Sequence, residues 1–363
     1  MPGENTSKNS QKTVVVGMSG GVDSSLTAAL LQEQGFLVIG VYMKNWSEPI
    51  KGVEHCPWIQ DQLDARMVAQ QLDIPFYTVD FEEEYKKFVI DSFLEDYKVG
   101  RTPNPDILCN QFIKFDYFYK YAKSLGADCV ATGHYARVED GKLLKGVDPK
   151  KDQSYFLWAI NKDVLPEVLF PLGSMTKDQV RKAAADRGLV TAKKKDSQGI
   201  CFIGQADVRD FLSHYFAPKQ GDVLNKEGKV VGQHRGAVFY TIGQRAGISD
   251  IEWPDPTARP TLYVLSVNTQ ANTITIGEEA DLYASGLEAD SAQWFTNIPV
   301  PGTQLTAKIR YGQQATPCVM VETGANALRV SFDAPQRAIT PGQSIVFYRD
   351  DAVVGGAIIN KAL

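Results

Sequence analysis

Hydrophobic residues follow two patterns along this chain, and the change between them lies near residue 207. In the first half, short aliphatic runs that read as buried strands alternate with longer amphipathic stretches that read as helices. The predicted strands are 14–16, 36–43, 76–80 and 128–134, and the predicted helices are 23–31, 63–72, 85–97 and 112–125. This alternation predicts an α/β fold with a doubly wound parallel sheet. Residues 150–206 are expected to be mostly helical.

Beyond residue 207 the apolar runs become short and alternating, and Gly and Pro separate them. Residues 221–232 predict a hairpin that turns at 225–228. Further predicted strands are 261–267, 273–276, 308–311, 327–332, 344–348 and 353–359. Many short strands with turn signals predict a small β-rich central domain and a C-terminal β-barrel. We therefore expect a disordered tail (1–12), an α/β domain (13–206), a central domain (207–278) and a barrel (279–363).

One stretch of the first half has the chemistry of an anion site. The predicted strand at 14–16 runs into a loop of small residues at 17–24, and a helix follows from Asp23 or Ser24. Backbone N–H groups and the helix dipole would point at a bound anion there. No Lys follows as in a Walker A loop, and the glycines are adjacent instead of spaced as in a dinucleotide fingerprint. An ordinary tight turn is the alternative, although three Ser and three Gly within 17–25 exceed what a turn needs.

Two other predicted strands end in residues that suit the same site. Met43 lies at the end of the second strand, and Gly133 and His134 end the fourth. Ligands of such sheets bind beyond the carboxyl ends of the strands, so we expect these residues to meet the 17–24 loop around one nucleotide.

Two cysteines stand in irregular segments and not in periodic apolar ones. Cys109 lies in the stretch 100–110, where two prolines are expected to exclude regular structure and to stiffen the chain. Cys201 lies in a second irregular loop at 196–204. A thiolate is a good nucleophile when its pKa is lowered, and Asp106 could handle a proton nearby. Two unrelated buried thiols remain the alternative.

Composition narrows the class of protein. The chain has 363 residues, 44% hydrophobic and 22% charged, which is typical of a globular protein. No apolar run reaches membrane-spanning length, residues 1–12 lack the apolar core of a signal peptide, and we expect a cytoplasmic protein without a membrane partner. None of the five Cys forms a C-x-x-C pair, which argues against a zinc ribbon or a disulfide scaffold.

Charge is distributed unevenly on this acidic chain. The net charge is -5, yet 177–195 holds seven basic residues against two acidic ones. Such a local basic run can bind a phosphate backbone, although a solvated helix face explains it equally well.

Four motifs, in this order, resemble the tRNA-specific 2-thiouridylase family. They are the loop at 17–24, the run 100–110, the run 151–157 and the run 199–204. The first resembles the pyrophosphate loop of ATP pyrophosphatases, which split ATP between its α and β phosphates. The likeness covers nearly the whole chain from Val14. One departure is Gln198, where the family often has Thr.

The resemblance implies roles for particular residues. ATP would be bound by Gly17, Met18, Ser19, Gly20, Gly21, Val22, Asp23, Ser24, Met43 and Gly133. The target uridine would be bound by Asn104, Pro105 and Asp106, and the catalytic residues would be Asp106, the nucleophile Cys109 and the persulfide carrier Cys201. Contacts to tRNA would come from His134, Lys151, Asp152, Gln153, Arg310, Tyr311 and Gln343.

These roles imply an adenylation followed by a sulfur transfer. ATP, with Mg²⁺, would activate the C2 carbonyl of a wobble uridine of tRNA, and a sulfur donor protein would supply the persulfide. Three alternatives remain. The chain could be another ATP pyrophosphatase that acts on a small molecule, or a non-catalytic module that binds tRNA or nucleotides. Asp106, Cys109 and Cys201 could instead hold an iron–sulfur cluster.

Overall fold

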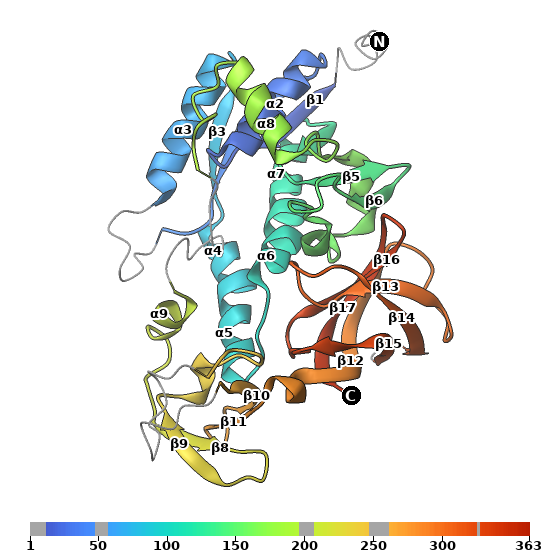
Figure 1. Ribbon diagram of the computed structural model, residues 1–363. Coiled ribbons are helices and arrows are strands. Elements are labelled where there is room, and N and C mark those ends of the chain that lie inside the picture. The colour runs from blue at the N-terminus through green and yellow to red at the C-terminus, as the bar shows by residue number, and fades with distance from the viewer. Residues whose placement is uncertain (1–11, 48–56, 196–206, 247–260, 325–326) are drawn as a thin grey trace. The chain divides into compact units, whose positions relative to one another are not determined.

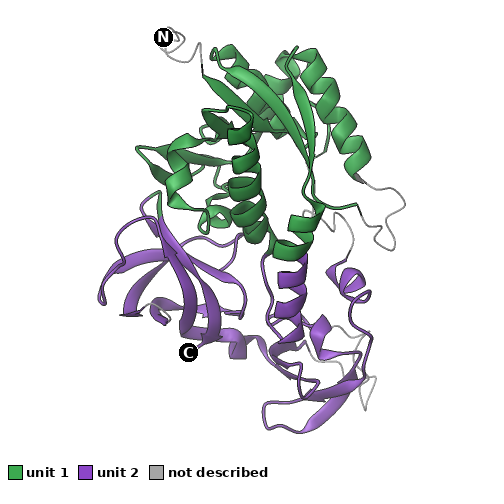
Figure 2. Cartoon of the chain, turned by 180° about the vertical axis from the view of Figure 1, so that it is seen from behind, with its two compact units in different colours: residues 1–89, 105–206, 351–353 green, residues 90–104, 207–350, 354–363 purple. Residues whose placement is uncertain are grey.

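The computed structural model describes residues 12–47, 57–195, 207–246, 261–324 and 327–363. The chain forms two compact units, coloured separately in Figure 2. Unit 1 consists of residues 1–89, 105–206 and 351–353, and unit 2 of residues 90–104, 207–350 and 354–363. Cys56, Cys201, the predicted loop at 196–204 and nearly all of the predicted tail lie outside the described residues.

Unit 1 is built on a parallel sheet, as predicted, and the sheet has a fifth strand, β7 (Val168–Leu169), that the sequence did not predict. Its strands are β1 (Thr13–Gly17), β2 (Leu37–Lys44), β3 (Phe76–Asp80), β4 (Cys129–Ala131) and β7. Their order in the sheet is β3-β2-β1-β4-β7. The chain moves outward from β1 to β3 and then returns to the other side of β1, so the strand order reverses between β1 and β4. Such a switch point is where open α/β sheets bind their ligands.

Three helices share one apolar core with the strands of unit 1. They are α2 (Val22–Glu33), α3 (Pro57–Gln71) and α8 (Lys177–Asp186), which lie together near β1 and β3 in Figure 1. Leu26 of α2, Val68 of α3 and Val180 of α8 are completely buried in this core with Val14 and Val16 of β1. Burial of a strand on both faces explains why β1 reads as an uninterrupted apolar run.

The proline-rich stretch before Cys109 is more regular than predicted. Pro105 begins a short helix, α6 (Pro105–Leu108), which continues into a π-helical segment (Cys109–Tyr117) and α7 (Phe118–Ser124). Proline is well tolerated at the first position of a helix, because its missing N–H would have no partner there. The expectation that the prolines exclude regular structure is therefore wrong from Pro105 onward.

The predicted helix at 85–97 is confirmed. It consists of α4 (Glu82–Tyr85), a π-helical turn (Lys86–Ile90) and α5 (Asp91–Lys98), which follow one another without a break. Residues 150–195 hold two 3₁₀ turns (Ser154–Leu157 and Lys162–Glu167) and β7 besides α8, so this region is less helical than expected. A hairpin that the sequence did not predict, β5 (Ala136–Glu139) and β6 (Lys142–Lys145), follows β4.

Unit 2 contains the predicted β-rich parts. Its central sheet has the order β10-β11-β8-β9 and consists of β8 (Gly221–Leu224), β9 (Val230–His234), β10 (Tyr263–Asn268) and β11 (Thr273–Gly277). The β8–β9 hairpin turns where predicted, because Gly228 adopts φ +78° and its N–H donates to the carbonyl of Asn225. A short helix, α9 (Val208–Leu212), precedes this sheet along the chain.

Six antiparallel strands at the C-terminus close into a barrel, drawn in orange to red in Figure 1. They are β12 (Tyr283–Trp294), β13 (Gln304–Lys308), β14 (Thr316–Thr323), β15 (Leu328–Arg337), β16 (Ser344–Arg349) and β17 (Ala352–Ala362). The pairing of β12 with β17 completes the ring, and removes the exposed edges of an open sheet. Strand β13 ends at Lys308, so the predicted strand at 308–311 is wrong beyond its first residue.

Candidate functional site

The loop after β1 has the backbone geometry of an anion site. Gly20 adopts φ +74°, and a Cβ there would lie 2.1 Å from the carbonyl oxygen of Asp61, so only glycine fits. The N–H of Ser19 donates to Oγ of Ser24 over 3.1 Å, which folds the loop over the start of α2. Gly21 caps α2 without a side-chain hydrogen bond. The first-turn N–H groups therefore have no intrahelical acceptor and face the side where an anion would bind.

The ends of three parallel strands meet at this loop, as the sequence predicts. A Cβ on Gly133, just after β4, would lie 2.9 Å from both the carbonyl carbon of Asp23 and the nitrogen of Ser24. On the side of β2, Cε of Met43 would lie 3.1 Å from a Cβ on Gly17. The structure thus brings together the loop, Met43 and Gly133 at the switch point of the sheet.

A lysine and a tyrosine that the sequence analysis did not single out complete this loop. Nζ of Lys177 lies 2.8 Å from each carboxylate oxygen of Asp23, and its side chain is only 11% exposed. The phenol of Tyr135 donates to Oδ1 of Asp23 over 2.8 Å, and its ring lies 5.7 Å from the same ammonium. Lys177 is the first residue of α8. Thr176, just before it, forms a capping box, and this capping box orients the first turn of the helix. In the sequence this lysine is hidden in the basic run.

His134 is a buried, neutral histidine in unit 1. Its Nδ1 lies 2.7 Å from the hydroxyl of Thr132, and its Nε2 lies 3.5 Å from the ammonium of Lys114. Because a lysine can only donate, Nε2 is the acceptor and Nδ1 carries the proton. Burial lowers the pKa of His134 well below its usual value, and the charge of Lys114 lowers it further. Its ring packs against Phe115 and Phe170, so its predicted tRNA contact stays a prediction.

Asp106 and Cys109 lie three residues apart in continuous helical backbone, since Leu108 between them has φ -62° and ψ -41°. Residues at this spacing are neighbours on one face of a helix. The side chain of Cys109 is buried, with 1% of the residue exposed. Next to it, the amide of Asn110 donates to the carbonyl of Phe156 over 3.0 Å and anchors the segment. Cys201 lies outside the described residues, so its proximity to Cys109 stays a prediction.

Two other cysteines have the properties of structural thiols. Desolvation raises the pKa of Cys129 in β4, and it raises the pKa of Cys318 in β14 to about 12. Both thiols therefore stay protonated near neutral pH, where a thiol is a poor nucleophile. Neither cysteine competes chemically with Cys109 for the predicted role.

Several residues predicted to contact tRNA also stabilise local structure. In unit 1, Oδ1 of Asp152 accepts from the N–H groups of Gly146 and Ser154, and Oε1 of Gln153 accepts from the N–H of Tyr135. Lys151 precedes them in the same turn, and its N–H donates to the carbonyl of Asp148. None of these bonds tests the predicted contacts to tRNA.

The corresponding residues of unit 2 behave similarly. The guanidinium of Arg310 donates to the carbonyls of Ile242 and Ala338, and Tyr311 beside it is half-buried. Nε2 of Gln343 donates to the carbonyl of Thr102 over 2.8 Å, close in sequence to Asn104. These contacts leave the roles of Arg310, Tyr311 and Gln343 as predictions.

The basic run at 177–195 is largely compensated within unit 1. The pairs are Lys177 with Asp23, Lys182 with Asp186, Arg187 with Glu33, and Lys194 with both Asp61 and Asp64. Lys193 and Lys195 are exposed. Counting charges along the sequence therefore overstates the positive surface that this run offers to a phosphate backbone.

Within the described part of the chain, no three His, Cys, Asp or Glu side chains form a metal site. Over the same residues, no helix is long and apolar enough to cross a membrane.

Family models divide the chain into three matched parts. A "tRNA methyl transferase HUP domain" matches residues 12–205, a "tRNA methyl transferase PRC-barrel domain" matches 209–278, and an "Aminomethyltransferase beta-barrel domain" matches 284–359. The part matched at residues 12–205 is an α/β nucleotide-binding domain of the pyrophosphate-loop type. Its parallel sheet, the switch point and the loop after β1 define this class, and the fold indicates ATP use.

Curated relatives are similar over almost the full chain. The tRNA-specific 2-thiouridylases MnmA of Pseudomonas syringae pv. syringae and Serratia proteamaculans are each 46% identical, over 98% of this chain and 96% and 99% of their own lengths. MnmA of Methylococcus capsulatus is 47% identical over 96% of both chains. This chain belongs to the family of the tRNA-specific 2-thiouridylases.

Solved structures are more distant. The U34-tRNA thiolase NcsA from Methanococcus maripaludis is 19% identical, with a TM-score of 0.35 over 53% of this chain and 63% of that chain. NMN synthetase from Francisella tularensis is 18% identical, with a TM-score of 0.35 over 55% and 72%. These similarities are too low to carry a functional argument.

Proposed function

We propose that this protein is a tRNA-uridine 2-sulfurtransferase, which uses ATP to convert the C2 carbonyl of a wobble uridine (position 34 of tRNA) into a thiocarbonyl. The observation that carries the proposal is the meeting of the 17–24 loop, Met43 and Gly133 at the sheet's switch point, in a chain whose relatives are named tRNA-specific 2-thiouridylases. An ATP site alone fits many reactions, and the family membership selects this one.

The first step activates an inert carbonyl. A uracil C2 oxygen is a poor leaving group, so the oxygen attacks the α phosphorus of ATP, the bond to the β phosphate breaks, and pyrophosphate leaves. The C2 oxygen then carries AMP, and AMP is a good leaving group. The loop N–H groups of residues 17–24 would hold the departing pyrophosphate, where preorganised donors cost no rearrangement during the reaction.

Charge near the loop suits a polyphosphate with its cation. Lys177 offsets the carboxylate of Asp23, so the loop does not repel the nucleotide as a bare carboxylate would. Mg²⁺ bound to the phosphates would neutralise further charge. Both oxygens of Asp23 already accept hydrogen bonds, and most Mg²⁺ ligands would therefore come from the phosphates and water, as is usual for this ion.

The second step transfers sulfur. The terminal sulfur of a persulfide on Cys201 attacks C2, and AMP leaves. The thiolate of Cys109 then attacks Sγ of Cys201, which breaks the S–S bond to the transferred sulfur and leaves 2-thiouridine and a Cys109–Cys201 disulfide. A dithiol reductant reopens the disulfide, and a persulfide-carrying donor protein reloads Cys201. A reducing compartment permits such a transient bond, which favours the cytoplasm.

Other residues would position the RNA. Asn104 and Pro105 would line the target base, which must leave its stack to react, and Asp106 would also handle the proton of Cys109 on the same helix face. Contacts to the rest of the tRNA would come from His134, Lys151, Asp152, Gln153, Arg310, Tyr311 and Gln343. The domain boundaries that we propose are 13–206 for catalysis, 207–278 for tRNA binding and 279–363 for the barrel.

Separating the two half-reactions tests the proposal. The full-length Cys201→Ser and Cys109→Ser variants should still release pyrophosphate and form AMP when tRNA is present, but they should form no stable 2-thiouridine. Cys129→Ala is the matched control, because burial already keeps that thiol protonated. Pyrophosphate exchange with and without tRNA distinguishes this enzyme from an ATP pyrophosphatase of small molecules. Full thiolation by Cys201→Ser would reject the persulfide scheme.

An iron–sulfur cluster on Asp106, Cys109 and Cys201 is the alternative route for sulfur. Three ligands without a C-x-x-C pair would leave one iron open. A colourless, fully active preparation would exclude that route, and a coloured preparation whose activity follows its iron content would replace the persulfide scheme.

A further inference from the structure

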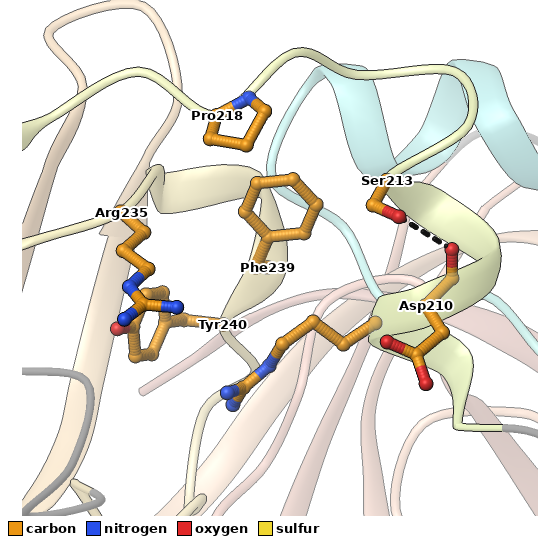
Figure 3. A pocket seen from close by; sticks show the side chains of 7 residues that line it. Asp210, Ser213, Pro218, Arg235, Phe239 and Tyr240 are labelled. Atoms are coloured by element: carbon orange, nitrogen blue, oxygen red, sulfur yellow. Dashed lines mark hydrogen bonds between the residues drawn. The ribbon is translucent and has the colours of Figure 1, made fainter.

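A pocket in unit 2 plays no part in the thiolation chemistry above. It has a volume of about 170 Å³ and lies between α9 and the segment that follows β9 (Figure 3). Its lining includes Arg209, Asp210, Pro218, Arg235, Phe239 and Tyr240. All of these residues lie within the part of the chain matched by the PRC-barrel model.

Aromatic rings form the wall of this pocket. Tyr240 is 4% exposed and belongs to the apolar core of the central sheet, and its ring lies 5.3 Å from that of the buried His234. Phe239, in the 3₁₀ turn before it, is half-buried, and Figure 3 shows its ring between Pro218 and Tyr240. Because Tyr240 is held by the core, the wall can receive a planar ligand with little loss of conformational entropy.

Positive charge lies over these rings. The guanidinium carbon of Arg209 is 5.8 Å from the ring centre of Tyr240. Arg235 is exposed at the end of β9, and in the described part of the chain no side chain or carbonyl accepts a hydrogen bond from its guanidinium. Among the described residues of the lining, Asp210 supplies one carboxylate against the two guanidinium groups of Arg209 and Arg235, so these residues carry a net positive charge. Guanidinium groups bind phosphate in a bidentate manner, and they also stack on planar rings.

The size of the pocket restricts its ligand. Pockets for drug-sized molecules measure about 300–1,000 Å³, so this one suits a single planar ring system with its charged group outside. An aromatic platform combined with guanidinium groups is the usual means of binding an unpaired base and its phosphate.

We propose that this pocket binds one unpaired nucleotide of the tRNA other than the target uridine. The base stacks on the half-buried ring of Phe239, the buried Tyr240 supports the wall of the pocket, and the phosphate pairs with Arg235 and Arg209. The inference rests on the proposed function only in taking the RNA to be tRNA.

Two substitutions in the full-length protein test the two halves of this site. Phe239→Leu keeps apolar volume and removes the ring, and Arg235→Gln removes an exposed charge that the fold does not use. Each should weaken the binding of labelled tRNA by roughly 5- to 100-fold, the range of one stacked base. Arg235→Gln should also reduce the slope of log K against log salt by about 0.7, whereas Phe239→Leu leaves the slope unchanged.

Lys229→Gln is the matched control. It removes one exposed charge from the same hairpin, but Lys229 does not line the pocket. Its affinity for tRNA should stay within about twofold of the parent protein, with thermal unfolding of all three variants measured alongside. Normal tRNA binding by both pocket variants would overturn the inference. This holds also if the two variants bind tRNA normally but lose affinity for another protein.

The two proposals fail in different ways. At saturating tRNA the pocket variants should thiolate at the parent rate, with a raised KM. If the parent protein binds tRNA but forms no 2-thiouridine, the proposed function fails, and weaker RNA binding by the pocket variants still supports the pocket. If thiolation proceeds and KM is unchanged in both variants, the pocket assignment alone fails.

Discussion

Replacing Lys177 by Met tests the charge balance of the anion loop. The ammonium of Lys177 lies 2.8 Å from both oxygens of Asp23, with only 11% of its side chain exposed. Methionine retains much of the aliphatic length of lysine and removes the charge. Asp23 then keeps the hydrogen bond from Tyr135, but the loop carries an uncompensated carboxylate where ATP should bind.

The structure sets the scale of the effect. A hydrogen bond to a charged group contributes about 1.5–3 kcal/mol. Because the side chain of Asp23 is 32% exposed, water replaces part of this interaction, and we expect unit 1 to lose about 1–2 kcal/mol of unfolding free energy. Lys182→Met on the same helix is the control, since Lys182 and Asp186 are 76% and 59% exposed and should contribute about 0.5 kcal/mol or less.

The loss of ATP affinity should be larger than the loss of unfolding free energy alone would explain. We expect Lys177→Met to weaken ATP binding by about tenfold or more, equivalent to about 1.4 kcal/mol, because the new negative charge repels the phosphates. Adding Asp23→Asn should restore part of the affinity. Calorimetry and urea unfolding of the four members of this double-mutant cycle measure both effects. Unchanged ATP affinity, with an unfolding cost no greater than that of Lys182→Met, would refute the reasoning.

Three further predictions follow from unit 1. Gly133→Ala should cost about 1–3 kcal/mol of stability and weaken ATP binding, as measured by unfolding and calorimetry, because its Cβ would lie 2.9 Å from the backbone of Asp23; normal ATP affinity would contradict this. Burial lowers the pKa of His134, so protonation of this residue favours the unfolded state. The unfolding free energy should therefore fall as the pH drops below 6.5, the ordinary pKa of histidine. His134→Gln should flatten this pH dependence, and an identical pH profile of the variant would contradict the prediction. Reversing the charges of the exposed Lys193 and Lys195 to Glu should weaken tRNA binding and reduce its salt dependence; unchanged binding would make the run a solvated helix face.

The alternation of apolar and polar positions was sufficient for most of the architecture. Val14, Val15 and Val16 are buried in a central parallel strand, and β3 spans the predicted residues 76–80. The hairpin at Asn225–Gly228 was also predictable, because its turn depends on residues adjacent in sequence. Such features are local, and each is determined by the period of hydrophobicity or by the conformational freedom of glycine.

The proline-rich segment shows where local rules give two answers. Proline excludes the interior of a helix but fits its first position, so the same Pro105 is compatible with a loop or with the start of α6. The chain around Cys109 is helical because packing completes the turn: Ile107 and Ile113 are both buried in unit 1. The sequence alone could not choose between these outcomes.

The sequence by itself determined the sheet, the anion loop and the set of residues that carry the family resemblance, since these depend on short-range pattern. Only the tertiary structure decided which charges offset one another. Lys177 and Asp23 are 154 residues apart, and Lys194 and Asp61 are 133 apart, yet both pairs are in contact. The physical reason is that an ion pair depends on distance in space, and packing of α2, α3 and α8 around one core sets that distance.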